Sequence, residues 1–133
     1  MTELTVRRTI PAPVDRVWRA FTTDELAAWL WPGSWGTIAE VDLRVGGHYR
    51  IASKSVGMAV SGEFVSVEPP ARLVQTWRWD GEDEETLVTI TFEPADQGTA
   101  LTVVHERFGD ETTRDEHLQG WNDCLARLAP HLV

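Results

Sequence analysis

The chain has 133 residues, the usual size of one domain, so we expect a single domain over residues 1–133. Hydrophobic residues make up 42% of the chain and charged residues 25%, a composition that excludes disordered, collagen-like and low-complexity proteins. The 12 basic and 21 acidic residues give a formal net charge of −9 at pH 7. This charge disfavours anionic partners, so we expect no binding to nucleic acid and none to membranes.

The first elements in chain order are a strand and two short helices. The sequence predicts a strand over Thr5–Ile10, which a Pro-Ala-Pro segment ends. Apolar residues spaced by three and four predict a helix over 14–21. A second short helix is expected to have Asp24 as its N-cap and to run to Leu30, where a Pro-Gly pair breaks it and leaves an irregular loop rich in tryptophan.

Six further strands are expected after this loop. Apolar and polar residues alternate there, which is typical of half-buried strands. Turns are predicted at Gly46 and Gly47, at an acidic segment around Gly81, and at Pro94–Gly98, and short turns favour an antiparallel meander. The strands are expected over Ala39–Arg44, His48–Ser53, Met58–Val67, Leu73–Trp79, Leu87–Phe92 and Leu101–His105.

After Gly109 the pattern predicts one long C-terminal helix with a single apolar stripe. Only the inner face of the sheet has the length needed to cover that stripe. The expected fold class is therefore α+β, with a curved antiparallel sheet of about six to seven strands wrapped around the helix. Because a curved sheet does not close tightly on one helix, we expect a cavity between them. The stripe consists of Leu118, Trp121, Leu125, Leu128 and Leu132.

Six blocks of the sequence resemble one protein superfamily. They are IPAPVDRVWRAFT at 10–22, WLWPG at 29–33, VGGHYR at 45–50, GEFVSVEPPARLV at 62–74 followed by TW at 76–77, VTITFEP at 88–94, and GW at 120–121. The blocks resemble the SRPBCC (START-like) superfamily, and within it the branch related to the activator of the heat-shock-protein-ninety ATPase. The resemblance implies a helix-grip fold with a cavity between sheet and C-terminal helix.

The resemblance also implies where a ligand would lie. Trp29–Trp35 would border the cavity entrance. Gly47, Tyr49 and Ile51 would lie along an inner strand, and Gly120 and Trp121 would face the sheet. No catalytic set accompanies this branch. Since the same architecture serves lipid binding, polyketide cyclisation and co-chaperone work, the fold alone does not fix an activity.

Seven tryptophans are a high number for a chain of this length. Trp77 and Trp79 share one face of a strand, and with Trp121 they would form an aromatic wall suited to a planar ligand. Alternatively, the indoles fill the core and leave little cavity. The expected ligand-binding residues are Trp29, Trp31, Trp35, Tyr49, Ile51, Phe64, Trp77, Trp79, His105 and Trp121.

Signals for catalysis are weak in this sequence. There is no Gly-x-Ser-x-Gly motif, and the four histidines lack metal-ligand spacing, so we expect no metal and no cofactor. His105 would either meet a ligand, as a hydrogen-bonding or proton-transferring group, or be a hydrogen-bonded residue at a strand end. Cys124, the single cysteine, is expected to be a packed thiol, with pocket lining as the alternative.

Three functions remain open. The leading hypothesis is binding of a small hydrophobic molecule, aromatic or lipid-like, without catalysis. One alternative is an enzyme of polyketide cyclase or aromatase type, for which His105, Glu63 and Tyr49 are the candidate titratable groups. The other is a chaperone-associated interaction module, implied by the resemblance alone and disfavoured by the single-domain length.

The expected location of the protein is the cytoplasm. The N-terminus lacks the pattern of a signal peptide, and no run of 18 apolar residues occurs. The sequence leaves open whether the chain forms a homodimer.

Overall fold

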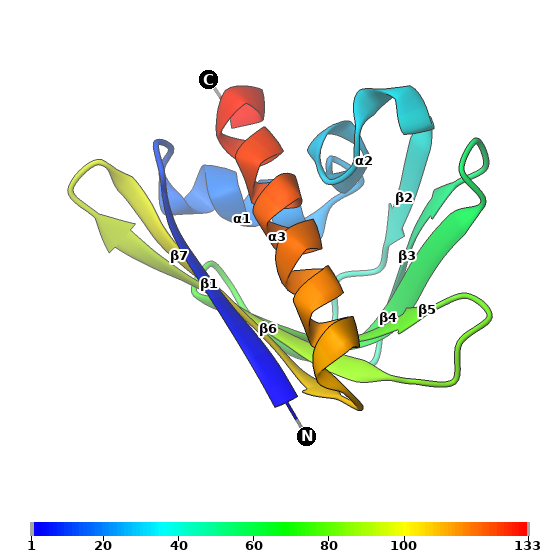
Figure 1. The fold of residues 1–133 in the computed structure, drawn as a ribbon. Helices are drawn as coiled ribbons and strands as arrows, with labels where there is room; N and C mark the ends of the chain where they lie inside the picture. The colour runs from blue at the N-terminus through cyan, green and yellow to red at the C-terminus, as the bar shows by residue number, and fades with distance from the viewer. Residues whose placement is uncertain (1, 133) are drawn as a thin grey trace.

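The computed structural model describes residues 2–132, in which one strand is followed by two short α-helices, a 3-10 helix, six strands and a long helix (Figure 1). The strands are β1 (Thr2–Ile10), β2 (Thr37–Val41), β3 (His48–Ser53), β4 (Met58–Glu68), β5 (Arg72–Trp79), β6 (Thr86–Ala95) and β7 (Gly98–Phe108). The helices are α1 (Val14–Thr22), α2 (Leu26–Trp29), the short 3-10 helix η1 (Gly33–Trp35) and α3 (Glu111–Leu132).

The seven strands form one antiparallel sheet in the order β1-β7-β6-β5-β4-β3-β2. Strands β2 to β7 follow one another as a meander, and β1 pairs along the free edge of β7, for example Val6 with Val103. The sheet bends around α3 (Figure 1). The predicted α+β helix-grip fold is confirmed.

Two predicted turns differ from the structure. β2 ends at Val41 and β3 begins at His48, so residues 42–47 make the connection instead of a tight glycine turn. The reason is that this segment folds against β4: the amide of Gly46 donates to the carbonyl of Phe64, and the amide of Phe64 donates to the carbonyl of Gly47. The turn predicted at Pro94–Gly98 is shorter in the structure, because β6 continues through Ala95, which pairs with Gly98 of β7.

Helix α2 also begins later than the sequence predicts. Its N-cap position is occupied by Glu25 and not by Asp24. The hydroxyl of Thr23 accepts a hydrogen bond from the amide of Glu25 at 3.2 Å, so the chain turns one residue later. The side chain of Glu25 is thereby free to make the contacts described below.

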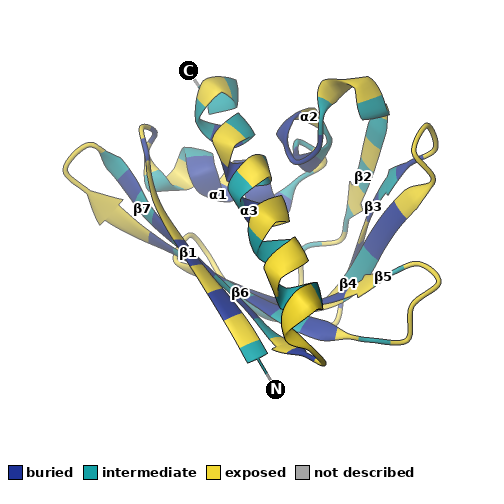
Figure 2. Ribbon diagram, viewed as in Figure 1, coloured by how far each residue is buried: buried dark blue, intermediate teal, exposed yellow. Residues whose placement is uncertain are grey.

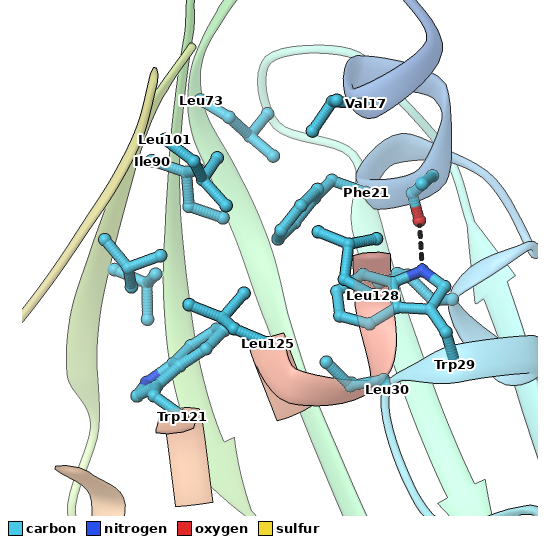
Figure 3. Close-up of a cluster of buried hydrophobic side chains, with 14 of the residues drawn as sticks. Val17, Phe21, Trp29, Leu30, Leu73, Ile90, Leu101, Trp121, Leu125 and Leu128 are labelled. Atoms are coloured by element: carbon cyan, nitrogen blue, oxygen red, sulfur yellow. Dashed lines mark hydrogen bonds between the residues drawn. The ribbon is translucent and has the colours of Figure 1, made fainter. Parts of the chain in front are cut away.

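The core lies between the inner face of the sheet and α3. Alternate residues of β6 from 88 to 92 are buried, as expected for a strand with one inward face (Figure 2). Trp121, Leu125 and Leu128 of α3 point into this core (Figure 3). Much of the rest of α3 is exposed, and no helix within residues 2–132 is long and apolar enough to cross a membrane.

Helices α1 and α2 close one end of the core. Trp29 is 1% exposed, its ring meets Phe21 at a centroid distance of 4.9 Å, and its Nε1–H donates to the carbonyl of Ala20 at 3.0 Å (Figure 3). Because its only polar group is bonded to the end of α1, this indole belongs to the core. The sequence had suggested a position at the cavity entrance.

Polar contacts hold α3 over one half of the sheet. Arg8 of β1 donates to the side chain of Asn122, and Arg114 donates to the hydroxyl of Thr2 at 2.9 Å. As a result α3 packs nearest to β1 and β7, while β4 and β5 lie farther from it. This off-centre position determines where space remains inside the fold.

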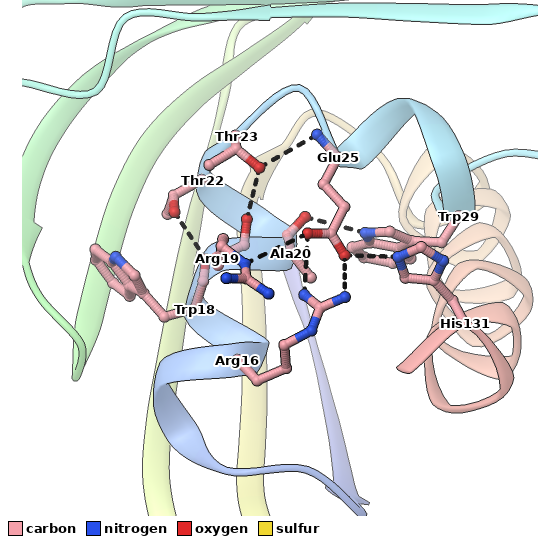
Figure 4. A network of polar contacts seen from close by, with 9 residues as sticks. All are labelled: Arg16, Trp18, Arg19, Ala20, Thr22, Thr23, Glu25, Trp29 and His131. Atoms are coloured by element: carbon pink, nitrogen blue, oxygen red, sulfur yellow. Dashed lines mark hydrogen bonds and ion pairs between the residues drawn. The ribbon is translucent and has the colours of Figure 1, made fainter. Parts of the chain in front are cut away.

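The carboxylate of Glu25 joins the three helices (Figure 4). It lies 2.7 Å from Nη2 of Arg16 in α1 and 2.6 Å from Nε2 of His131 near the end of α3. Burial by itself would raise the pKa of Glu25, but the hydrogen bonds from Arg16 and His131 outweigh it and hold the pKa below its usual range. The charged form of Glu25 therefore stabilises the fold.

We expect Glu25→Gln to lower the free energy of unfolding by about 1–3 kcal/mol, because it leaves Arg16 and His131 without their anionic partner. Urea unfolding at pH 7 measures the loss. The matched control is Glu93→Gln, which removes an exposed carboxylate and should change stability by less than about 0.5 kcal/mol. Equal stability of the two variants would show that the network contributes nothing.

Candidate functional site

An open pocket lies between α3, the paired ends of β4 and β5, and the segment around η1. Its volume is about 530 Å³, within the range of small-molecule sites. Helix α3 packs nearest to β1 and β7, so it does not lie directly over β4 and β5. The inner face of these two strands is therefore covered by side chains. The pocket is the part of this region that those side chains leave unfilled.

Five tryptophans line the pocket as one series of touching rings, which we call the indole arc. Their order is Trp35, Trp31, Trp79, Trp77 and Trp121, with successive centroids 5.5, 6.0, 5.7 and 5.5 Å apart. The arc connects the η1 segment to β5 and β5 to α3. Each such aromatic contact is worth about 0.5–1.5 kcal/mol beyond the area it buries, so the arc also holds these three elements together.

The rings of the arc are inclined to one another at different angles. The planes of Trp31 and Trp79 are 14° apart and stacked, whereas those of Trp77 and Trp79 are 85° apart. Trp77 and Trp79 are alternate residues of β5, so both face inward, as their spacing predicts. The arc therefore forms a corner and not a flat wall.

Behind the arc, a chain of hydrogen bonds connects α3 to the sheet through His105. The Nε1–H of Trp121 donates to Nδ1 of His105 at 3.0 Å. The other ring nitrogen of His105 then carries the proton and lies 2.6 Å from the hydroxyl of Thr86, which donates to the carbonyl of Trp77 at 3.1 Å. Every polar atom of this buried chain has a partner.

A bulge in β7 brings His105 and Phe108 to the same face. Arg107 has a φ of 75°, in the left-handed region that residues other than glycine rarely adopt, and the register between β1 and β7 shifts at this point. The bulge interrupts the alternation of the strand, so two residues three positions apart both point inward. The ring centroids of His105 and Phe108 lie 4.5 Å apart. His105 is thus packed on both sides and completely buried.

His105 is a neutral group in this environment. Burial, with a smaller contribution from the nearby His117, lowers its pKa to about 2. The imidazole does not line the pocket and does not lie at the end of its strand, because β7 continues to Phe108. Its position agrees with neither predicted role, ligand contact or strand end, although the predicted hydrogen bonding is present.

A second histidine supports the arc from α3. The Nε1–H of Trp79 donates to Nε2 of His117 at 2.9 Å, and Nδ1 of the same ring lies 2.8 Å from the carbonyl of Thr113. Only the tautomer with its proton on Nδ1 satisfies both contacts. His117 therefore orients the indole of Trp79 at the pocket wall.

Arg127 and Cys124 complete the α3 side of the pocket. The guanidinium of Arg127 donates to the carbonyls of Trp29 and Leu30 at 3.1 and 2.7 Å, so it closes the C-terminal end of α2. Burial raises the pKa of the Cys124 thiol to about 11, with Arg127 acting in the opposite direction. Cys124 is a protonated pocket-lining thiol and not a nucleophile.

The predicted ligand-binding residues divide into two groups. Those that line this pocket are Trp31, Trp35, Trp77, Trp79 and Trp121. Those that do not line it are Trp29, Tyr49, Ile51, Phe64 and His105. Each member of the second group is at most 2% exposed, because its side chain is packed in the interior.

Several pocket residues carried no prediction. Their shared signal is a second stripe along α3, spaced by three and four residues, that runs beside the apolar one. The apolar pattern does not reveal this stripe, because its members are polar or charged. They are Thr113, Glu116, His117, Asp123 and Arg127.

The described residues offer no evident metal site. Within residues 2–132, no three side chains of His, Cys, Asp or Glu are grouped so that they could hold an ion. The pocket instead presents aromatic rings on its walls and carboxylates at its rim, which suits an organic molecule held by contact area and charge.

The family of the chain follows from a comparison with protein-family models. Residues 11–132 match the model of the activator of Hsp90 ATPase homolog 1-like proteins. The chain belongs to this family. No curated protein sequence gives a significant match.

Solved structures of similar proteins share the fold of this family member. A Chromobacterium violaceum protein is 31% identical, with 98% of this chain and 96% of that one covered and a TM-score of 0.84. DynU16, from the dynemicin biosynthetic locus, is 30% identical at a TM-score of 0.81, and 98% of this chain matches 46% of it. An HSP90 activator from Plasmodium falciparum is 23% identical, with 99% and 96% covered and a TM-score of 0.81, which supports the fold alone.

We expect His105 to make stability depend on pH. The unfolded chain binds a proton at His105 near pH 6.5 and the folded chain only near pH 2, so stability falls as the pH drops between these values. The slope is about 1.4 kcal/mol per pH unit, or about 2 kcal/mol between pH 6.5 and 5. Urea unfolding of the parent and of His105→Gln at both pH values measures it, and an identical pH dependence of the two proteins would contradict the account.

Proposed function

We propose that this protein binds one small hydrophobic molecule with an aromatic part in the pocket lined by the indole arc. The observation that carries the proposal is the arc itself: five adjacent indoles line an opening of about 530 Å³. Trp31, Trp77 and Trp121 are at most 6% exposed, so they pack against the core and also line the pocket. Trp18 and Trp29 belong to the core and do not line the pocket. Indoles give large contact areas at a small cost in conformational entropy, which suits ligand binding.

One ring that lines the pocket, that of Trp77, has an N–H group without a hydrogen-bond partner among the described residues. Trp77 is 6% exposed, and its Nε1 is buried without a hydrogen-bond acceptor among the described residues. An indole N–H left unpaired costs about 1–3 kcal/mol, and such groups are commonly satisfied by ordered water or by a ligand atom. A ligand with an oxygen beside its ring would suit this wall.

Binding is better supported than catalysis of the cyclase type. None of the three candidate titratable groups lines the pocket. His105 is neutral in the core, Glu63 is exposed 3.6 Å from His48, and the hydroxyl of Tyr49 donates to the carbonyl of Thr76 at 2.5 Å. Burial raises the pKa of Tyr49 well above its ordinary value, so this hydroxyl keeps its proton.

Family membership is also compatible with an interaction with a chaperone ATPase. The geometry within residues 2–132 adds support to ligand binding only. Location in the cytoplasm stays a prediction from the sequence, and the formation of a homodimer stays open.

A pocket-filling variant tests the proposal. Gly120 lines the pocket, and a Cβ at this position would meet no atom within 4 Å, so a larger side chain can enter the pocket without strain. We expect Gly120→Leu to bind the neutral dye Nile red about tenfold or more weakly than the parent, measured by dye fluorescence. It should unfold at higher urea concentration, because leucine favours a helix over glycine by about 0.8 kcal/mol.

The matched control is Gly120→Ala, which gives a similar gain in helix stability while adding only one methyl group. It should keep the dye affinity of the parent within about threefold. If Gly120→Leu is folded and binds the dye as the parent does, the dye lies elsewhere and the proposed site is wrong.

A further inference from the structure

We infer that the ligand of this pocket is an organic cation, with an ammonium or other cationic group attached to an aromatic ring system. This inference rests on the proposed function and adds the charge of the ligand. Three features carry it: the inclined ring faces of the arc, the sign of the charges that line the pocket, and the lack of cationic partners for two of its carboxylates.

The corner of the arc has the geometry that binds cations. A cation is attracted to the face of an indole within about 6 Å of the ring centroid, and recognition improves when several faces surround it. Trp77 and Trp79 stand at 85° and Trp31 and Trp35 at 53°, so the rings that line the pocket lie in several orientations.

The charges that line the pocket are mostly negative. The only guanidinium is that of Arg127, which is committed to two backbone carbonyls of the α2 end. His117 is committed as the acceptor of the Trp79 N–H, and this contact requires the neutral ring. Four carboxylates face them, from Asp80, Glu82, Glu116 and Asp123.

Two of these carboxylates are free to interact with a ligand. Asp80 is paired with Arg50 at 2.7 Å, and Asp123 accepts from Gln119 at 3.0 Å. Glu82 and Glu116 take part in no ion pair within residues 2–132. They come from different walls of the pocket, the connection after β5 and the face of α3. A cation seated against the rings would therefore have carboxylates on two sides.

The net charge of −9 acts in the same direction at long range, because it attracts cations and repels anions. Since Glu82 and Glu116 are exposed, their contribution should be weakened by salt. The predicted preference for a cation should therefore fall as the ionic strength rises, whereas the affinity due to contact between rings should not.

Three naphthalene probes of equal ring size test the charge preference as competitors of bound Nile red. They are (2-naphthylmethyl)trimethylammonium, its neutral isostere 2-neopentylnaphthalene, and 2-naphthylmethanesulfonate. At low ionic strength, about 20 mM, we expect the cation to displace the dye at an about tenfold lower concentration than the neutral isostere, with the sulfonate weakest. In about 0.5 M salt the advantage should shrink to about threefold, the part due to the ring faces.

A charge-removing variant assigns the preference to the pocket. In Glu82→Gln/Glu116→Gln the cation should keep only an about threefold advantage over the neutral isostere at low salt, with both probes measured on the same variant. The control is Glu93→Gln/Asp96→Asn, which removes two exposed carboxylates at the β6–β7 hairpin. Its net charge equals that of the Glu82→Gln/Glu116→Gln variant. This control should retain the about tenfold preference.

The possible failures are separable. If Nile red and the neutral probe bind but the cation has no advantage, the inferred ligand charge is wrong and the proposed binding function stands. If both double variants lose the preference equally, it arises from the total charge, and the assignment to Glu82 and Glu116 is wrong. If neither the dye nor any probe binds, the proposed function fails and this inference with it.

Discussion

The hydrogen bond between the indole of Trp121 and the buried imidazole of His105 sets how α3 meets the sheet. Both partners are large rings, so the helix is held one indole away from β7 and cannot settle directly onto the strand. One ring nitrogen of His105 accepts the hydrogen bond of Trp121, and the other donates its proton to Thr86. Only the neutral imidazole has one acceptor and one donor nitrogen. The site therefore depends on a histidine that does not touch it.

The two ends of α3 are held differently. At its C-terminal end, Arg127 and His131 bind α2 and Glu25, and Leu125 and Leu128 fill the core. Toward its N-terminal end, the helix is fixed to β1 and leaves the inner face over β4 and β5 to the indole arc. The pocket stays open over β4 and β5 because α3 packs nearest to β1 and β7.

Much of the fold could be predicted because it rests on local patterns. Alternation fixes that Trp77 and Trp79 share a face, and the spacing of Trp121, Leu125 and Leu128 fixes the inner stripe of α3. The position of the Trp29 side chain in the core could not be predicted, because the acceptor of its N–H is a carbonyl at the end of a different helix. Local pattern says which face of an element is buried, and it does not say what the opposing surface is.

The candidate site was predicted only in its aromatic part. The rings of the arc are conspicuous in the sequence, whereas its other members are small or charged residues that any solvent-facing helix could carry. Asp123 is an example: nothing local distinguishes an exposed helical aspartate from one that borders a pocket. Glu82 sits in an acidic hairpin that reads as a solvated turn, and only the tertiary fold brings it to the rim with Glu116.

The most direct test of the account follows the seven indole N–H signals in a ¹⁵N–¹H correlation spectrum while a neutral naphthyl ketone is added. The account predicts that the signals of the indole arc shift together with a single saturation curve, whereas those of Trp18 and Trp29 keep their positions. Saturable shifts confined to Trp18 and Trp29, or no saturable shift of any indole at all, would contradict the claim that the arc surrounds a binding pocket.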